Sequence, residues 1–338
     1  MEIFKKYDNC IFCGSKNLKI EKKQYYPNNF YLDAIKSDLN ISKKKFKKMK
    51  VFRCLNCSIL QNNPWFTDNI SRRIYSNIYG QHNRSWSNVI DFFRKQKLPN
   101  HGKLFDLIFK QIKIKKYAEF NSPFMGLFLN IFSHENKKNV KFLKKLFHLT
   151  ITYLSLRQVA GKSKQIQKKS MNKANKTLMV LNKLKPKNKL KTNIKKYLFV
   201  DNSSLCWGQN DNYKSVNSKS LATEIFNLEI FDIKKKNKNL KLDMFSIFHT
   251  LDHTFEPKYI LDYGLKNSKY VLVYCHVNEH LEKQHLFSIT NNFLKYLKKK
   301  NIYLINLTDK IDKKFKSPEL YFICSKSRKY IDNLRAKL

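Results

Sequence analysis

Two cysteine pairs near the start of the chain constrain its fold more than any other feature. Two residues separate Cys10 from Cys13, and two separate Cys54 from Cys57. Each C-x-x-C turn presents two sulfurs to one ion, and four thiolates close the tetrahedral shell of Zn²⁺. Because a closed shell leaves no position for a substrate, the pairs predict a structural zinc site. A disulfide framework is the alternative interpretation.

The remaining cysteines favour a reducing compartment. The chain has seven cysteines, and three of them are scattered at 206, 275 and 324. The N-terminus lacks the apolar stretch of a secretory signal, and the longest apolar runs, at 123–132 and 146–156, are too short to span a bilayer. We therefore expect a cytoplasmic protein.

The formal net charge of +43 invites a nucleic-acid interpretation, which the composition weakens. Only eight of the 68 basic residues are arginine, although arginine matches phosphates and base edges better than lysine does. Abundant Lys, Asn, Ile and Phe are what A/T-rich codons produce. We therefore attribute most of the charge to genome composition, and binding of nucleic acid is not favoured.

One stretch exceeds this basic background. Residues 136–196 contain 19 Lys or Arg and no Asp or Glu. Apolar residues at helical spacing predict a basic amphipathic helix, followed by a lysine-rich connector that ends near Pro186. These apolar residues are Val140, Leu143, Leu146, Phe147 and Leu154. A solvated insertion is the simplest interpretation, and an anionic membrane surface or a polyphosphate-bearing partner are the alternatives.

After residue 116 the chain alternates short apolar runs with polar segments. Runs of four to six apolar residues suit buried strands of a largely parallel sheet, and segments such as 218–226 and 289–298 suit crossover helices. The pattern predicts an α/β fold with a doubly wound, Rossmann-like sheet whose ligands bind at the carboxyl ends of the strands. The seven predicted strands are 117–120, 197–200, 228–231, 244–248, 270–274, 302–307 and 320–324.

The order of these patterns along the chain predicts three domains. A zinc-binding module occupies residues 1–65, and a helical lid or linker follows at 66–116, where helical patterns cover 70–78 and 85–97. The Rossmann-like domain then runs from 117 to 338, with the basic insertion inside it.

Several segments resemble bacterial zinc-binding, class I S-adenosylmethionine-dependent methyltransferases, including sugar C-methyltransferases. The resemblance is patchy but covers most of the chain. The segments that carry it are Cys10–Gly14, Cys54–Cys57 with Leu60–Pro64, Tyr75–Gly80 with Ser85-Trp86, His249–Pro257 and Gln284–Ser288. The fourth of these looks like the family's H-x-x-E-H segment after the fourth strand, with Asp252 in place of Glu.

The resemblance implies that the chain binds S-adenosyl-L-methionine after the first strand. Glu119 matches the family's acidic position there. The glycines of the turn that follows in the family are replaced by Asn121, Pro123 and Met125, with one glycine displaced to Gly126, and the cofactor would also contact Ser122 there. Since the φ angle of proline is locked at negative values, this turn departs from the usual backbone.

The resemblance also gives roles to acidic residues after the next two strands. Asp201 would bind the ribose hydroxyls at the end of the second strand, as a carboxylate does in dinucleotide folds, and Asp232 would lie near the adenine. A competing register places the cofactor loop at 201–208 instead. Each carboxylate also has an ordinary interpretation as a helix cap or an exposed loop residue.

His253 is the predicted catalytic residue. A methyl acceptor has to lose a proton, and histidine titrates in the range suited to a general base. His249 would contact the cofactor or orient the site. A buried or surface histidine without a catalytic role is the alternative. The H-x-x-D-H spacing also approximates the inverted zinc-protease motif, but the preceding residues read as a strand and Asp is shorter than the required Glu.

These expectations predict an S-adenosylmethionine-dependent methyltransferase with a structural zinc module and a small polar acceptor, such as a nucleotide-linked sugar. Two other classes stay open. One is a non-catalytic binding module that keeps the methyltransferase fold, and the other is a zinc protein that binds or modifies RNA.

Overall fold

The structure is a computed structural model that describes residues 2–25, 48–71, 105–120, 137–139, 163–185, 196–201, 229–232, 240–248, 251–277, 285–311 and 319–338, with single positions between 141 and 187. Within these ranges, none of the helices combines the length and the apolar character that a bilayer-spanning segment requires.

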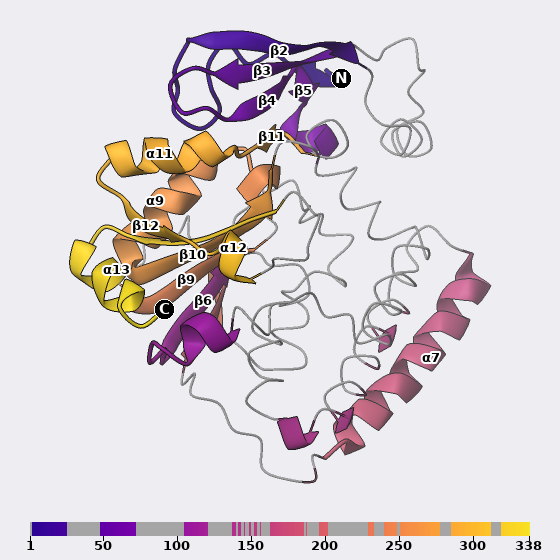
Figure 1. Ribbon diagram of the computed structural model, residues 1–338. Coiled ribbons are helices and arrows are strands. Elements are labelled where there is room, and N and C mark those ends of the chain that lie inside the picture. Colours follow the sequence, from indigo (N-terminus) through magenta and orange to yellow (C-terminus); the bar gives the residue numbers. More distant parts are fainter. Residues whose placement is uncertain are drawn as a thin grey trace.

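A mostly parallel sheet forms the centre of the described part of the chain (Figure 1). Five neighbouring strands run parallel to one another, and β13 runs antiparallel to both of its neighbours, β10 and β12. The seven strands of this sheet are β6 (Lys116–Phe120), β7 (Lys196–Asp201), β8 (Glu229–Asp232), β9 (Leu242–Phe248), β10 (Ser268–His276), β12 (Tyr303–Asn306) and β13 (Glu319–Ser325). Each predicted apolar run falls on one of them, and the α/β prediction is confirmed.

The strand order places a topological switch point beside β6. Across the sheet the order is β12-β13-β10-β9-β6-β7-β8, so the first five strands of this sheet, numbered 1 to 5 from β6 to β10 along the chain, follow the doubly wound order 3-2-1-4-5. In such sheets ligands bind outside the carboxyl ends of the strands, where the order reverses. Here that point lies between β6 and β9. We call the side of the sheet formed by the carboxyl ends of its parallel strands the carboxyl edge.

One face of the sheet packs against α9 (Pro257–Asn267) and α11 (Asn291–Lys299). Phe120, Phe245 and Val271 belong to the apolar core on this side. The approach of α9 is close, because a Cβ built on Gly264 would lie 2.6 Å from Cδ1 of Phe245. A residue without a side chain is therefore required at this position of the helix.

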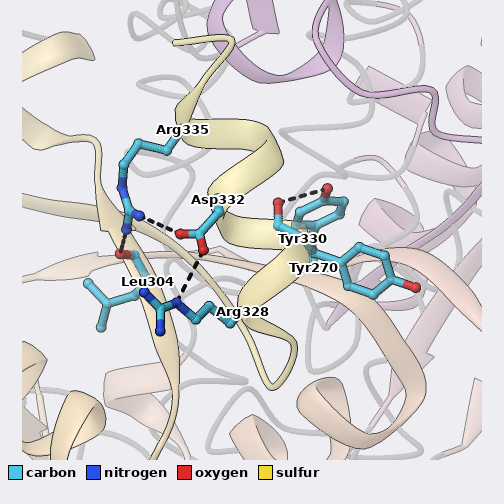
Figure 2. Close-up of polar contacts among 6 residues, drawn as sticks. All are labelled: Tyr270, Leu304, Arg328, Tyr330, Asp332 and Arg335. Atoms are coloured by element: carbon cyan, nitrogen blue, oxygen red, sulfur yellow. Dashed lines mark hydrogen bonds and ion pairs between the residues drawn. The ribbon is translucent and has the colours of Figure 1, made fainter.

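The helix α13 (Arg328–Arg335) packs against the other face, on which Tyr270 lies (Figure 2). The Tyr270 hydroxyl donates to the carbonyl of Tyr330 at 3.3 Å. Asp332 accepts from Nε of Arg328 at 3.3 Å and from Nη1 of Arg335 at 2.7 Å, and Nη2 of Arg335 donates to the carbonyl of Leu304 at 3.4 Å. Exposed pairs of this kind contribute about 0–1 kcal/mol each, so they orient the helix more than they stabilise it.

The opposite ends of the central strands are tied together by Asp243. Its Oδ2 accepts from the backbone N–H groups of Lys115 and Lys116 at 2.9 and 3.0 Å, and Nζ of Lys269 donates to Oδ1 at 2.8 Å. Burial alone would raise the pKa of Asp243, but these hydrogen bonds outweigh it and hold the pKa below its usual value. Asp243 thus links β6, β9 and β10 far from the carboxyl edge.

The N-terminal region forms a second sheet, which incorporates a strand from the C-terminal half. The order is β11-β4-β3-β2, and β1 pairs separately with β5. The strands are β1 (Phe4–Lys5), β2 (Leu18–Tyr25), β3 (Met49–Cys54), β4 (Leu60–Asn63), β5 (Trp65–Phe66) and β11 (Phe287–Ser288). The predicted boundary at residue 65 falls inside β5, and the three-domain division stays a prediction, with most of 66–116 outside the described residues.

The basic stretch contains a helix where the sequence predicts a connector. Helix α7 spans Lys164–Lys183, begins at Ser163, whose side chain accepts from the backbone N–H of Ile166, and buries Ala174 and Leu181. Its residues include no proline and no glycine, and Lys, Gln, Leu and Met favour helix. The helix lies well away from the N-terminal sheet (Figure 1).

Candidate functional site

The four predicted metal ligands come together in the N-terminal region. Cys10 and Cys13 lie on one turn and Cys54 and Cys57 on another, and their sulfurs all lie within 4.8 Å of one another. In each turn the backbone N–H four residues after the first cysteine donates to its carbonyl, at 2.9 Å from Gly14 and 2.8 Å from Ser58. Both closing residues have positive φ, 74° for Gly14 and 64° for Ser58.

The sulfur positions fit a tetrahedral ion and exclude disulfides in this structure. Sγ of Cys10 lies 3.5 Å from Sγ of Cys57, and Sγ of Cys13 lies 3.6 Å from Sγ of Cys54. Four sulfurs at about 2.3 Å from a Zn²⁺ ion would be about 3.8 Å apart, whereas a disulfide bond is about 2.05 Å long. The geometry therefore suits a four-sulfur metal site, and zinc stays the predicted ion.

The surroundings of the cluster shift the pKa values of Cys10 and Cys13 in opposite directions. A hydrogen bond with Cys57 lowers the pKa of Cys10 to about 6, against the effect of burial. Burial raises the pKa of Cys13 to about 11.

Aromatic residues connect this cluster to α11. Phe12, inside the first cysteine turn, packs edge-on against Phe293 with ring centroids 4.8 Å apart and lies 6.3 Å from the ring of Tyr296. Burial, together with the four cysteines, raises the pKa of Tyr296 to about 12. The cysteine cluster is therefore packed directly against the helix that follows the fifth strand of the central sheet.

Glu119 lies at the carboxyl end of β6, beside the switch point. Its side chain is completely buried, and the Tyr117 hydroxyl donates to Oε2 at 3.3 Å. Ser246, which is also buried, is its register partner on β9. Burial and the neighbouring Glu119 raise the pKa of Tyr117 well above its usual value, so Tyr117 stays a neutral donor. A buried carboxylate of this kind is costly unless hydrogen bonds or a ligand compensate it.

Two further predicted carboxylates occupy equivalent strand ends. Asp201 is the last residue of β7 and Asp232 the last of β8, and the two residues are register partners. Asp201 is therefore the end of the second strand of the central sheet. Three adjacent strands thus carry an acidic residue at the carboxyl edge, namely Glu119, Asp201 and Asp232.

The predicted catalytic segment lies at the same edge. His253 ends the short 3-10 helix η6 (Leu251–His253), which follows β9. Its neighbour Asp252 is completely buried, and Oδ2 of Asp252 lies 3.5 Å from Nε2 of His285. His285, 5% exposed, precedes β11 and comes from the segment after β10. The structure thus pairs a buried aspartate from one loop with a buried histidine from the next.

His285 is the residue that the sequence analysis did not assign to the site. The signal was present, because His285 lies in the segment 284–288 that resembles the family's motif after the fifth strand. Four predicted cofactor residues, Asn121, Ser122, Gly126 and His249, lie outside the described residues, and their placement stays a prediction.

Comparisons with known proteins add little to this geometry. No protein family matches the chain, and no curated protein matches it. Solved structures that superpose on it include the plantazolicin methyltransferase BpumL in complex with SAH, at 10% identity and a TM-score of 0.35, covering 75% of this chain and 95% of that chain. Another is the YcgJ protein from Bacillus subtilis, at 5% identity and a TM-score of 0.32, covering 67% and 97%. TM-scores this low do not by themselves establish a shared fold or activity.

Proposed function

We propose that this protein is an S-adenosylmethionine-dependent methyltransferase with a structural zinc module, acting on a small polar acceptor such as a nucleotide-linked sugar. One observation carries the proposal. A single edge of the sheet brings together carboxylate residues at the ends of three strands, Glu119, Asp201 and Asp232, and a buried aspartate–histidine pair from the next two loops. This is the edge at which doubly wound sheets bind nucleotides.

The residues at this edge suit the cofactor in type. S-adenosyl-L-methionine, when bound, supplies a methyl group on a positively charged sulfur. Carboxylates at the ends of β7 and β8 suit its hydroxyls and its base, and buried Glu119 suits a cation. The predicted cofactor-binding residues are Glu119, Asn121, Ser122, Gly126, Asp201, Asp232 and His249.

Two histidines are candidates for accepting the proton of the acceptor. His253 is the residue predicted from the sequence, and His285 is the one that the structure adds. His285 has the arrangement of an oriented base, because the Asp252 carboxylate beside it can stabilise the imidazolium that forms when the ring takes a proton. The two candidates come from adjacent loops, so either would act at the same edge.

Calorimetry with S-adenosylhomocysteine tests the cofactor assignment. The zinc-loaded full chain should bind it with micromolar affinity, and Asp201→Asn should weaken binding about tenfold because one charged hydrogen-bond acceptor is lost. Asp243→Asn is the matched control at the opposite ends of the strands and should bind as the wild type does. Absence of heat with the folded wild type would remove the proposal.

Transfer of a labelled methyl group to a panel of nucleotide-linked sugars tests the catalytic assignment. Loss of the general base should lower kcat by about 10²- to 10⁴-fold while binding of S-adenosylhomocysteine is kept. His253→Gln and His285→Gln, measured side by side, identify which histidine is the base. Cofactor binding without transfer to any acceptor would favour the non-catalytic binding module.

RNA binding is the second candidate, and α7 is the observation that favours it. The helix carries six lysines and no acidic residue, and its exposed apolar residues, such as Met171, Met179 and Val180, do not form one face suited to a membrane. Steeply salt-dependent RNA binding that weakens when Lys168, Lys169 and Lys176 are changed to Gln would support it.

A further inference from the structure

Strand β4 carries three consecutive buried amide side chains, Gln61, Asn62 and Asn63, which are 1%, 0% and 6% exposed. The first and third bind the N-terminal segment. Gln61 accepts from the backbone N–H of Ile11 at 3.0 Å and donates to the carbonyl of Asn9 at 3.2 Å. Asn63 accepts from the N–H of Tyr7 at 3.0 Å and donates back to its carbonyl at 2.6 Å.

Asn62 makes its hydrogen bonds on the opposite side, to the segment after the fifth strand. Its side-chain Nδ2 donates to the carbonyl of His285 at 2.8 Å, and its backbone N–H donates to the carbonyl of Leu286 at 2.9 Å. Opposite directions are expected because successive side chains of a strand point to opposite faces. The first cysteine turn and the His285 segment are therefore held by neighbouring residues of one strand.

A further hydrogen bond joins the same two regions. The hydroxyl of Thr290, at the start of α11, donates to the carbonyl of Ser58 at 2.8 Å. Ser58 closes the second cysteine turn. The segment between His285 and Thr290 is thus attached at both ends to the N-terminal strands and cysteine turns, residues 2–25 and 48–66, which we call the cysteine module. Strand β11 pairs with β4 between these two points.

We infer that Asn62 is a positioning residue for His285, through which the cysteine module holds this histidine against Asp252. The inference rests on the proposed function, in which His285 is one of two candidate bases. An amide donor at 2.8 Å fixes the backbone of the residue whose ring lies 3.5 Å from the Asp252 carboxylate. Without it, a buried carbonyl loses its donor, and the ring is free to shift from the aspartate.

Hydrogen–deuterium exchange tests the positioning without any substrate. In zinc-loaded full-length Asn62→Ala, the amides of 285–290 should exchange about tenfold faster than in the wild type, with zinc content and the exchange of β13 unchanged. Gln61→Ala is the matched control on the same strand and should loosen 9–11 instead. Unchanged exchange at 285–290, or an equal increase throughout the chain, would overturn the inference.

Two further measurements test the inference, and the first of them does not require Asn62→Ala to fold. Thr290→Val removes only the donor to Ser58 and should accelerate exchange at 285–290 in the same way, whereas Thr308→Val, at the start of the remote α12 (Thr308–Ile311), should not. With an acceptor in hand, Asn62→Ala should lower kcat about tenfold with an unchanged cofactor KM. Full kcat would overturn the role in the reaction, whereas a wild type that does not bind S-adenosylhomocysteine would contradict only the proposed function.

Discussion

The cysteine module and the central sheet are stabilised in different ways. The sheet buries large apolar side chains on both faces, such as Phe245 and Phe322 towards α9 and Tyr274 on the other side. The module buries three cysteines and three amide side chains, with Cys13 half-buried, and most of its buried apolar residues join the same core as the sheet. Burial of apolar surface is non-directional, whereas hydrogen bonds and metal ligation fix positions. The module is therefore suited to holding a neighbouring segment in place.

Loss of a metal ligand should break the module and spare the sheet, and this is the largest effect that we expect. Cys57→Ser should lower zinc affinity at least about a hundredfold, because an open shell replaces a closed one. Zinc content by mass spectrometry should fall from one ion per chain, and exchange should rise at 10–15, 54–59 and 285–290. Cys275→Ala, a buried cysteine of β10, is the control and should keep its zinc. A full zinc content in Cys57→Ser would contradict the assignment.

Overpacking of the sheet should destabilise the sheet and leave the cysteine module intact. Gly264→Ala should lower the free energy of unfolding by about 1–3 kcal/mol, since the added methyl group would overlap the Phe245 ring. Urea unfolding measures this, and zinc content should not change. Lys266→Ala on the exposed side of the same helix should stay within about 0.5 kcal/mol of the wild type. An equal cost for both variants would show that α9 can move away from β9.

The Asp243 contacts should make the stability of the sheet depend on pH. Because the pKa of Asp243 is lowered in the folded state, its contribution is present above the unfolded pKa of about 3.9 and disappears as the pH falls through the folded pKa. Asp243→Asn should cost about 1 kcal/mol at pH 7 and nothing at the acid end. Asp262→Asn, an exposed partner of Lys258 on α9, is the control. A cost for Asp243→Asn that does not vary with pH would contradict this account.

The two residues that close the cysteine turns should affect zinc binding in opposite directions. Ser58 has φ of 64°, which costs a residue with a Cβ about 1–2 kcal/mol, so Ser58→Gly should strengthen zinc binding slightly in a chelator competition. Gly14→Ala should weaken it by a similar amount, and only through the backbone, because no atom lies within 4 Å of the added Cβ. If both variants strengthened zinc binding, or both weakened it, the positive φ of these residues would not be what sets their effect on zinc affinity.

Periodicity and motif spacing predicted much of the central fold. Each of the apolar runs became a strand, because buried parallel strands are almost continuously apolar, and the spacing of the four cysteines predicted their cluster. The helix α7 was interpreted as a connector because its lysines mask the apolar period, although its ends and composition favour helix. The helix is recognised only from its packing, in which Ala174 and Leu181 are buried.

The pairing of Asp252 with His285 was beyond the reach of sequence reasoning. The two residues are separated by the whole of α9 and β10, and only the return of the chain to β4 brings them together. For the same reason, Asn62 carries no signal in the sequence beyond its place in the segment after the second cysteine pair. Contacts over such separations depend on tertiary structure and not on local pattern.

The pairing of β11 with β4 has a practical consequence for anyone who trims this protein. A chain that began after Phe66 would leave the edge of Phe287–Ser288 without its strand partner and would uncover the rings of Phe293 and Tyr296 that meet Phe12. Unpaired strand edges beside bare aromatic rings promote self-association. The shortened protein should therefore aggregate, and the first 66 residues and the remainder should be produced as one polypeptide.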